Sequence, residues 1–147
     1  EDDGTIFTQA SQFGYTGTFL CGDGWSGVSG YAAAEALEGT VYCSAYAGDA
    51  DFEAAYAETY GEAVPNMFAP LGYDAAMLMV NAISKAEEQG LETGSDEYKA
   101  AVIEALAATD GVTGVTGTYK FDEFNNPIKD AAMMKLVNGE EVFTEMF

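Results

Sequence analysis

The sequence predicts an α/β fold, and three observations support this. In the first third of the chain, helical and strand-like segments alternate with glycines between them, which is typical of a parallel sheet with crossover helices. Three amphipathic helical segments then follow one another without an intervening strand. The end of the chain holds two apolar runs that flank Asn138-Gly139, and this pair is a strong hairpin signal.

Apolar residues at helical spacing predict a first helix over residues 5–13, which ends at Gly14. A short strand is expected at residues 18–21, followed by a glycine-rich loop. The alanine-rich segment 29–37 predicts a second helix. The β-branched and aromatic residues 40–46 predict the next strand, so the first third has the order α, β, α, β.

Three helices are predicted in the middle of the chain. The first is capped near Asp49 and ends at Gly61. The second starts after Pro65 and ends at Gly90, and the third opens at Ser95. The second helix carries the strongest periodic signal in the sequence, an apolar stripe expected to face the core. Its members are Ala75, Leu78, Met79, Ala82, Ile83 and Ala86.

Strand-like sequence returns after Asp110, where Gly and Thr become frequent. A strand is predicted at residues 118–122 and a turn at residues 125–127. The two apolar runs at residues 132–137 and 142–147 then predict the terminal strands on either side of the Asn-Gly turn.

The charge balance excludes several classes of function. The chain of 147 residues has 25 acidic and 5 basic residues, no His, and a formal net charge of −20. Nucleic acids and anionic membranes bind clusters of Lys or Arg, so we exclude both as partners. Catalytic triads that need an imidazole are also excluded. Without His and with only two Cys, we expect neither a metal site nor a cofactor.

The chain shows no membrane-spanning or targeting segment. No run approaches the roughly 20 apolar residues that cross a bilayer, and the first residues lack the layout of a signal peptide. The sequence instead starts directly in a helical pattern after Glu1-Asp2-Asp3-Gly4. We therefore expect upstream sequence to be missing and the chain to be a fragment of a longer protein.

The loop LCGDGWSG places an acid and the only Trp of the chain among three glycines. A phosphate-binding loop is a poor interpretation, because Asp23 would repel phosphate and the lysine of a P-loop is absent. As a catalytic acid, Asp23 lacks an evident titratable partner. Two alternatives remain. Asp23 is either a turn residue that bonds its own backbone or caps the next helix, or a carboxylate at the end of a parallel strand that receives a cation.

Four segments together resemble a known family. They read ASQFGYTGTFLCGDGW, LEGTVYCSAYAGD, FEAAYAETYGEAVPNMFAPLGYDAAMLMVNAISKA and GVTGVTGTYKFDEFNNP. In this order and spacing they resemble the second half of the type I periplasmic solute-binding proteins of bacterial ABC transporters. The branched-chain amino-acid (Leu/Ile/Val-binding) subgroup is the most similar, and the resemblance covers nearly the whole chain.

The resemblance implies half of a two-lobed fold, with Rossmann-like parallel sheets flanked by helices. Residues 1–46 would form the end of the second, C-terminal lobe, and residues 47–130 the returning half of the first, N-terminal lobe. Residues 131–147 would be the terminal strands that re-enter the second lobe. Hinge crossings are implied near Tyr46-Ala47-Gly48 and near residues 126–130.

The resemblance also implies a binding site. In the family, an acid just after a strand of the second lobe binds the α-ammonium group of the amino acid, and Asp23 stands at that position. Gly24 and Trp25 would lie beside it, with Trp25 as part of the wall. Phe68 and Pro70 match the segment by which the first lobe touches the ligand side chain.

Two residues of the YDA helix leave alternatives open. Tyr73 is either a ligand contact or a packed helix residue, and Asp74 is either a ligand contact or a solvated or hinge-bonding acid. The loops that bind the carboxylate of the amino acid lie in the N-terminal half of family members. The residues implied to contact ligand are Asp23, Gly24, Trp25, Phe68, Pro70 and Tyr73.

The function implied by the resemblance is non-enzymatic. It is that of the extracellular amino-acid-binding component of an ABC importer, which captures a branched-chain or other neutral amino acid between two lobes. The implied partners are the amino acid, a membrane permease and the missing N-terminal half. The implied location is the periplasm or extracellular face, with the full-length protein tethered as a lipoprotein. The alternatives are a ligand-sensing receptor domain of the same fold and an α/β enzyme that uses Asp23 as acid or base.

Two further expectations concern the isolated chain. Half of a two-lobed protein exposes sheet edges and apolar faces, so we expect the chain to dimerise, swap elements or bind its complement. Cys21 and Cys43 lie on neighbouring predicted strands, so a disulfide and a pair of reduced thiols both remain open.

Overall fold

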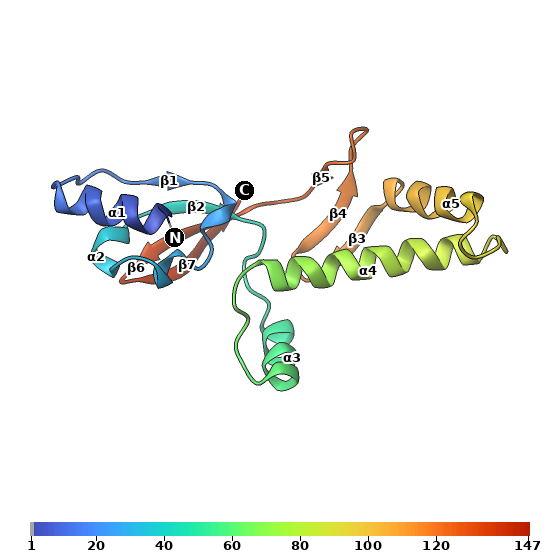
Figure 1. The fold of residues 1–147 in the computed structure, drawn as a ribbon, viewed down its shortest axis with the longest axis horizontal. Helices are drawn as coiled ribbons and strands as arrows, with labels where there is room; N and C mark the ends of the chain where they lie inside the picture. Colours follow the sequence, from blue (N-terminus) through green and yellow to red (C-terminus); the bar gives the residue numbers. More distant parts are fainter. Residues whose placement is uncertain (1) are drawn as a thin grey trace. The chain divides into compact units, whose positions relative to one another are not determined.

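The computed structural model describes residues 2–147, which divide into two compact units (Figure 1). Unit 1 holds the chain up to Met67 together with Asp130–Phe147, and unit 2 is Phe68–Lys129. Each unit combines helices with strands, so the predicted α/β class is confirmed.

Unit 1 is built on a four-stranded sheet in the order β1-β2-β6-β7. β1 (Leu20–Cys21) and β2 (Val41–Ser44) pair in parallel, as the sequence predicts. β6 (Ala132–Val137) pairs antiparallel with β2, and β7 (Glu140–Met146) forms the edge beyond β6. The terminal strands are antiparallel because a two-residue turn joins them.

The turn between β6 and β7 confirms the predicted hairpin. Asn138 and Gly139 have φ values of 53° and 84°, which is the left-handed backbone that a type I′ turn requires. Val137 pairs with Glu140 directly across the turn. The hairpin thereby returns the chain along β6 and brings Glu141 to the second position of β7.

The short helices of unit 1 differ from the prediction. α1 (Asp2–Gln12) starts earlier than expected, and its first turn carries the acids that suit a helix N-terminus. The single helix predicted at residues 29–37 is wrong. The structure has a 3₁₀ turn, η2 (Val28–Gly30), and a separate four-residue α2 (Ala34–Leu37). Glycine at the end of η2 disfavours continuation into a helix.

α3 (Ala50–Tyr60) confirms both predicted helix ends. The Asp49 side chain accepts a hydrogen bond from the Phe52 N–H at 2.8 Å, which caps the first turn. Gly61 has a φ of 74° and closes the last turn in the left-handed conformation. None of the α3 residues is fully buried, and Phe52 and Tyr56 on its apolar face are half-buried.

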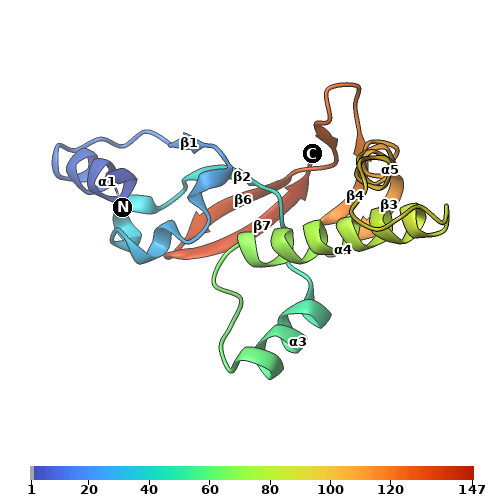
Figure 2. The same cartoon turned by 45° about the vertical axis from the view of Figure 1, so that its right-hand side comes forward.

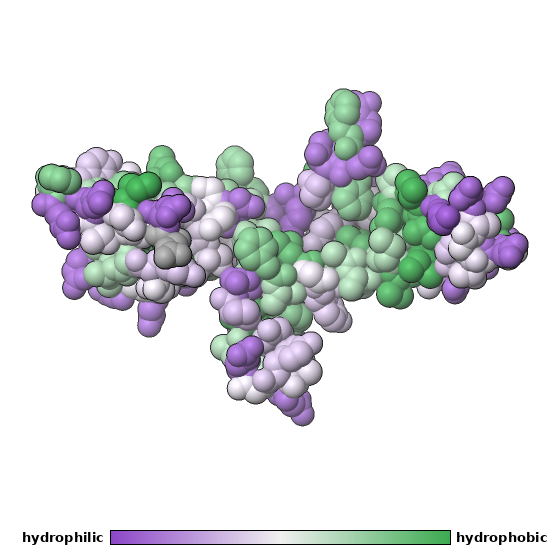
Figure 3. Space-filling view, in the orientation of Figure 1, coloured by the Kyte–Doolittle hydropathy of each residue, from purple (hydrophilic) through white to green (hydrophobic). Residues whose placement is uncertain are grey.

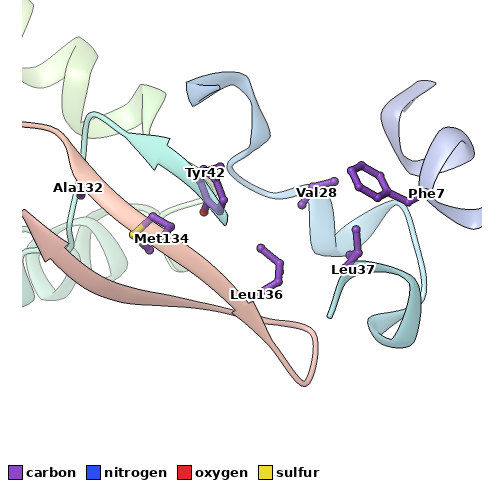
Figure 4. Packing of buried hydrophobic residues seen from close by; sticks show 7 residues of the cluster. All are labelled: Phe7, Val28, Leu37, Tyr42, Ala132, Met134 and Leu136. Atoms are coloured by element: carbon purple, nitrogen blue, oxygen red, sulfur yellow. The ribbon is translucent and has the colours of Figure 1, made fainter. Parts of the chain in front are cut away.

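The core of unit 1 lies between the sheet and the first helices (Figure 4). Alternate residues of β6 face it, which is the period of two expected for a strand with one buried face. Phe7 of α1 packs edge-on against Phe19, with ring centroids 4.1 Å apart. The buried members are Phe7, Val28, Leu37, Tyr42, Ala132, Met134 and Leu136.

Unit 2 consists of two long helices and a three-stranded antiparallel sheet in the order β3-β4-β5. α4 (Phe68–Glu87) and α5 (Asp96–Ala107) run side by side (Figure 2). The sheet is formed by β3 (Asp110–Gly114), β4 (Gly117–Phe121) and β5 (Pro127–Ile128). The predicted turn between β4 and β5 is present, with Asn125 at φ 63°.

The buried face of α4 is rotated relative to the prediction. Leu78, Ala82 and Ala86 are buried as expected, but Ala75 and Met79 are exposed. The stripe continues instead through Asp74, four residues before Leu78. Position 74 therefore lies on the buried face of α4 although it holds a carboxylate, and a search for apolar residues at helical spacing does not include it. Among residues 2–147, no helix is long and apolar enough to cross a bilayer.

Candidate functional site

The loop after β1 begins with a 3₁₀ turn, η1 (Asp23–Trp25). Gly22 takes the N-cap position in extended backbone, so Asp23 does not cap this turn. Asp23 and Gly24 are exposed, and a side-chain carbon on Gly24 would meet nothing within 4 Å. Within the described chain no hydrogen bond to the Asp23 carboxylate occurs, so the carboxylate is available to an external donor.

Trp25 anchors this turn to the core of unit 1. Its ring packs edge-on against Phe7, with centroids 4.3 Å apart and planes at 82°. Such an edge-to-face pair contributes about 0.5–1.5 kcal/mol beyond the burial of area. Trp25 is therefore partly a packing residue, and the acid two positions earlier sits on a turn that the indole holds in place.

Glu141 holds the backbone just after this turn, and nothing in the sequence pattern singles it out. Its carboxylate accepts the Gly27 N–H at 2.6 Å through Oε1 and the Tyr42 hydroxyl at 2.6 Å through Oε2. Burial, and then the hydrogen bond to Glu141, raise the pKa of Tyr42. The contact joins residues more than 90 positions apart, so local sequence gives no signal for it.

A hollow of about 540 Å³ opens in unit 1 next to this contact. Its lining combines hydroxyl groups, two glutamates and apolar side chains. The lining starts at Ser26, whereas Asp23, Gly24 and Trp25 are not part of it. Its principal side chains are Tyr42, Tyr46, Glu53, Met67, Met134 and Glu141.

Tyr46 is fixed in the wall of this hollow. Its hydroxyl accepts the Asp49 N–H at 2.7 Å and donates to Glu53 Oε1 at 3.1 Å. Burial, with the Glu53 hydrogen bond adding to it, raises the pKa of Tyr46 to about 12. The backbone N–H of Tyr46 also donates to Ser44 Oγ. Hydrogen bonds therefore fix both the backbone and the side-chain hydroxyl of Tyr46, just after β2.

The other predicted contact residues belong to unit 2. Phe68 and Tyr73 are 62% and 55% exposed, while Pro70 is buried. All three lie in the first turns of α4, where Pro70 is tolerated because early helix N–H groups need no intrahelical acceptor. The structure thus groups Asp23 with Gly24 and Trp25 in one unit, and Phe68 with Pro70 and Tyr73 in the other.

Asp74 is fully buried, so the solvated acid is excluded among the alternatives for this residue. Its carboxylate accepts the Val115 and Thr116 N–H groups, each at 2.8 Å, and the Tyr119 hydroxyl at 3.1 Å. The Thr116 hydroxyl donates to it at 2.7 Å. Lys129 donates to the same Thr116 oxygen at 2.6 Å, and burial lowers the pKa of Lys129. The carboxyl group can be buried here because both of its oxygens accept hydrogen bonds.

The cysteines are free thiols. Cys21 lies opposite Tyr42 in the parallel register of β1 and β2, which offsets it by one residue from Cys43. Side chains one position apart point to opposite faces of a sheet, so the two thiols do not face each other. Within residues 2–147, no three acidic or Cys side chains come together as metal ligands.

The comparisons with known proteins agree on one family. The sequence profile of the family described as periplasmic binding protein matches residues 1–141. The leucine-binding protein LivK of Thermotoga maritima is 29% identical, with a TM-score of 0.81 over 99% of this chain and 41% of that one. LivJ of Streptococcus pneumoniae, solved with isoleucine, is 28% identical, with a TM-score of 0.77 over 97% and 41%.

More distant structures share the fold. A solute-binding protein of an ABC transporter from Rhodopseudomonas palustris, solved with benzoate, is 22% identical, with a TM-score of 0.68 over 96% of this chain and 39% of that one. No curated protein sequence matches the chain. The chain spans about two fifths of the length of the solved structures it resembles. Since the family profile covers all but the last few residues, the chain belongs to the periplasmic binding protein family.

Proposed function

We propose that this chain is part of an amino-acid-binding component of an ABC importer, with Asp23 as the anchor for the α-ammonium group. The observation that carries the proposal is the exposed Asp23 carboxylate at the carboxyl end of the parallel strand β1. Open α/β sheets bind ligands at this edge. The similarity to LivK and to LivJ with isoleucine supports a branched-chain or other neutral amino acid.

The ammonium anchor follows from the chemistry of the turn. A charge-assisted hydrogen bond is roughly twice as strong as a neutral one, and it strengthens further when a closing lobe excludes water. Gly24 lets ligand approach the backbone, because no side chain occupies that space. Trp25 contributes the neighbouring wall of the site while its ring edge stays packed on Phe7.

Closure of two lobes supplies the remaining contacts. In this proposal residues 1–46 and 131–147 belong to the second lobe and residues 47–130 to the first, so that Phe68, Pro70 and Tyr73 approach the ligand from the opposite side. A ligand that touches both lobes only when they are shut shifts the population towards the closed form. The closed form is then presented to a membrane permease.

Calorimetric titration of the full-length protein with leucine, isoleucine, valine and phenylalanine tests this function. We expect Asp23→Asn to raise the Kd about 10- to 100-fold, the range set by a charge-assisted hydrogen bond. Asp51→Asn, at an exposed acid of α3, is the matched control and should leave the Kd unchanged. Unchanged affinity in Asp23→Asn would remove the anchor, and turnover of a bound substrate would favour an enzyme instead.

The cellular setting is part of the same proposal. We expect the full-length protein at the periplasmic or extracellular face, tethered as a lipoprotein. Fractionation of cells with antibody to this chain, followed by mass analysis of the mature N-terminus, checks both points. An acylated N-terminal cysteine supports the tether, whereas a continuous transmembrane helix leading to a signalling domain would favour a sensory receptor.

The surface of the isolated chain supports association with another copy or with its complement. Hydrophobic residues lie at the surface over α4 and α5 in unit 2 (Figure 3). Val80 is 61% exposed and Ile103 67%, while Phe13 of unit 1 is 89% exposed. Exposed apolar surface of this kind favours self-association or element swapping. Light scattering that gives one compact monomer at all concentrations would contradict this expectation.

A further inference from the structure

We propose that Glu141 is a positioning residue for the Asp23 turn, acting through the backbone of Gly27 and the hydroxyl of Tyr42. The inference rests on the proposed function, since it concerns how the ammonium anchor is held. Glu141 lies on β7, in the last eighth of the chain, far in sequence from the turn that it holds.

The geometry gives each carboxylate oxygen one donor. Oε1 accepts the Gly27 N–H at 2.6 Å, and Oε2 accepts the Tyr42 hydroxyl at 2.6 Å. The two donors come from different elements, the loop after η1 and the strand β2. An ionised carboxylate is an acceptor with two oxygens and no donor of its own, so one side chain can join both.

Gly27, whose N–H Glu141 accepts, is the point at which the backbone reverses after the Asp23 turn. Gly27 has a φ of 85°, in the left-handed region, and its N–H is aimed at Glu141. The chain on either side is fixed by packing, through Trp25 on Phe7 and through buried Val28. Glu141 therefore fixes the backbone between two packed side chains, which leaves Asp23 on a turn with little freedom.

Tyr42 connects this contact to the core. Its ring is 1% exposed and belongs to the buried cluster of unit 1 (Figure 4). Its hydroxyl donates to the Glu141 carboxylate. The carboxylate is thus held by a side chain that cannot move independently of the sheet. With Glu141 held in this way, we expect the Asp23 carboxylate to stay within the narrow range of positions that ligand binding requires.

The test combines a truncation, a conservative rescue and two controls. Glu141→Ala removes both acceptors. Glu141→Gln keeps an acceptor for Gly27 and offers an N–H to the Tyr42 oxygen. Glu145→Ala alters an exposed acid on the same strand, and Ala101→Gly lowers stability from the helix α5 of unit 2, outside the unit that holds the turn.

Two readouts separate the positioning role from ligand binding itself. In the ligand-free full-length protein, amide hydrogen exchange at Gly27 reports on the turn. Calorimetric titration with leucine and isoleucine reports on affinity. We expect Glu141→Ala to speed Gly27 exchange and raise the Kd about tenfold, with Glu141→Gln close to the wild type in both.

The outcomes distinguish the two proposals. Gly27 exchange unchanged in Glu141→Ala, or an equal loss of affinity in Ala101→Gly, would overturn the positioning role. If the wild type binds none of the amino acids but Glu141→Ala still loosens the turn, the proposed function fails and the positioning contact stands. If Glu141→Ala does not fold, Glu141→Asp, whose shorter side chain cannot reach both donors, is read in the same way.

Discussion

Asp74 Oδ2 accepts two hydrogen bonds from Thr116, one from the backbone N–H at 2.8 Å and one from the hydroxyl at 2.7 Å. This pair fastens the turn between β3 and β4 to the helix α4. Lys129 donates to the Thr116 hydroxyl oxygen at 2.6 Å and lies 5.0 Å from the Tyr119 ring centre. The helix α4, the turn between β3 and β4, and Lys129 at the end of unit 2 are therefore linked by hydrogen bonds around the buried Asp74 carboxylate.

Replacing this carboxylate should destabilise unit 2 strongly. Asp74→Ala leaves the Val115 and Thr116 N–H groups without their acceptor, so we expect a loss of about 3–5 kcal/mol in unfolding free energy. Urea unfolding followed by circular dichroism measures it. Glu87→Ala, at an exposed acid of the same helix, should stay within about 0.5 kcal/mol of the wild type. Equal losses in the two variants would contradict the buried network.

Gly114 is required because its neighbour is this same carboxylate. A Cβ added there would overlap the Asp74 carboxyl group, which its donors hold in place. We expect Gly114→Ala to cost about 1–3 kcal/mol in unfolding free energy. Gly72, inside α4, has nothing within 4 Å of an added Cβ, so Gly72→Ala should stabilise by up to about 1 kcal/mol. Thermal unfolding of the two variants should therefore shift in opposite directions.

The raised pKa of Tyr46 predicts how the unfolding free energy changes at alkaline pH. The folded state raises the pKa of Tyr46 from 10.0 to about 12, chiefly through burial. Between these values the unfolded state releases the phenol proton while the folded state keeps it, so the unfolding free energy falls as pH rises. Tyr46→Phe should make this fall less steep in urea titrations across that window, while Tyr42, whose pKa is also raised, keeps its own contribution. Tyr60→Phe, at a tyrosine that is 66% exposed, should keep the wild-type slope.

The features that the sequence predicts correctly depend on neighbouring residues. The Asn138-Gly139 turn, the Asp49 cap and the Ser95 cap each need a residue type within a few positions of its partner. The single helix expected at 29–37 is wrong because Gly30 interrupts the alanine-rich segment and separates η2 from α2. Local propensity is overridden where a backbone must turn sharply.

The supports of the candidate site could not be predicted in this way. Glu141 reaches Gly27 and Tyr42, and Asp74 reaches Thr116, across separations of 114, 99 and 42 residues. From sequence alone, each acid is one of 25 in a chain that is expected to carry them on its surface. Asp23 can be named as a candidate from the sequence because it follows a predicted strand, and a strand end is a local feature. The residues that hold its turn are set by the tertiary fold.

The two cysteines should remain thiols even under oxidising conditions. Because Cys21 is paired with Tyr42 across the strands, Cys43 presents its side chain to the other face of the sheet. Burial raises the pKa of Cys21, with Asp3 adding to it, so its thiolate fraction at neutral pH is small. We expect two thiols per chain in a colorimetric assay without reductant, Cys21 reacting faster as pH rises, and a Tm that does not change on adding reductant. A mass increase of two hydrogens on reduction would show that the strands shift to let the sulfur atoms meet.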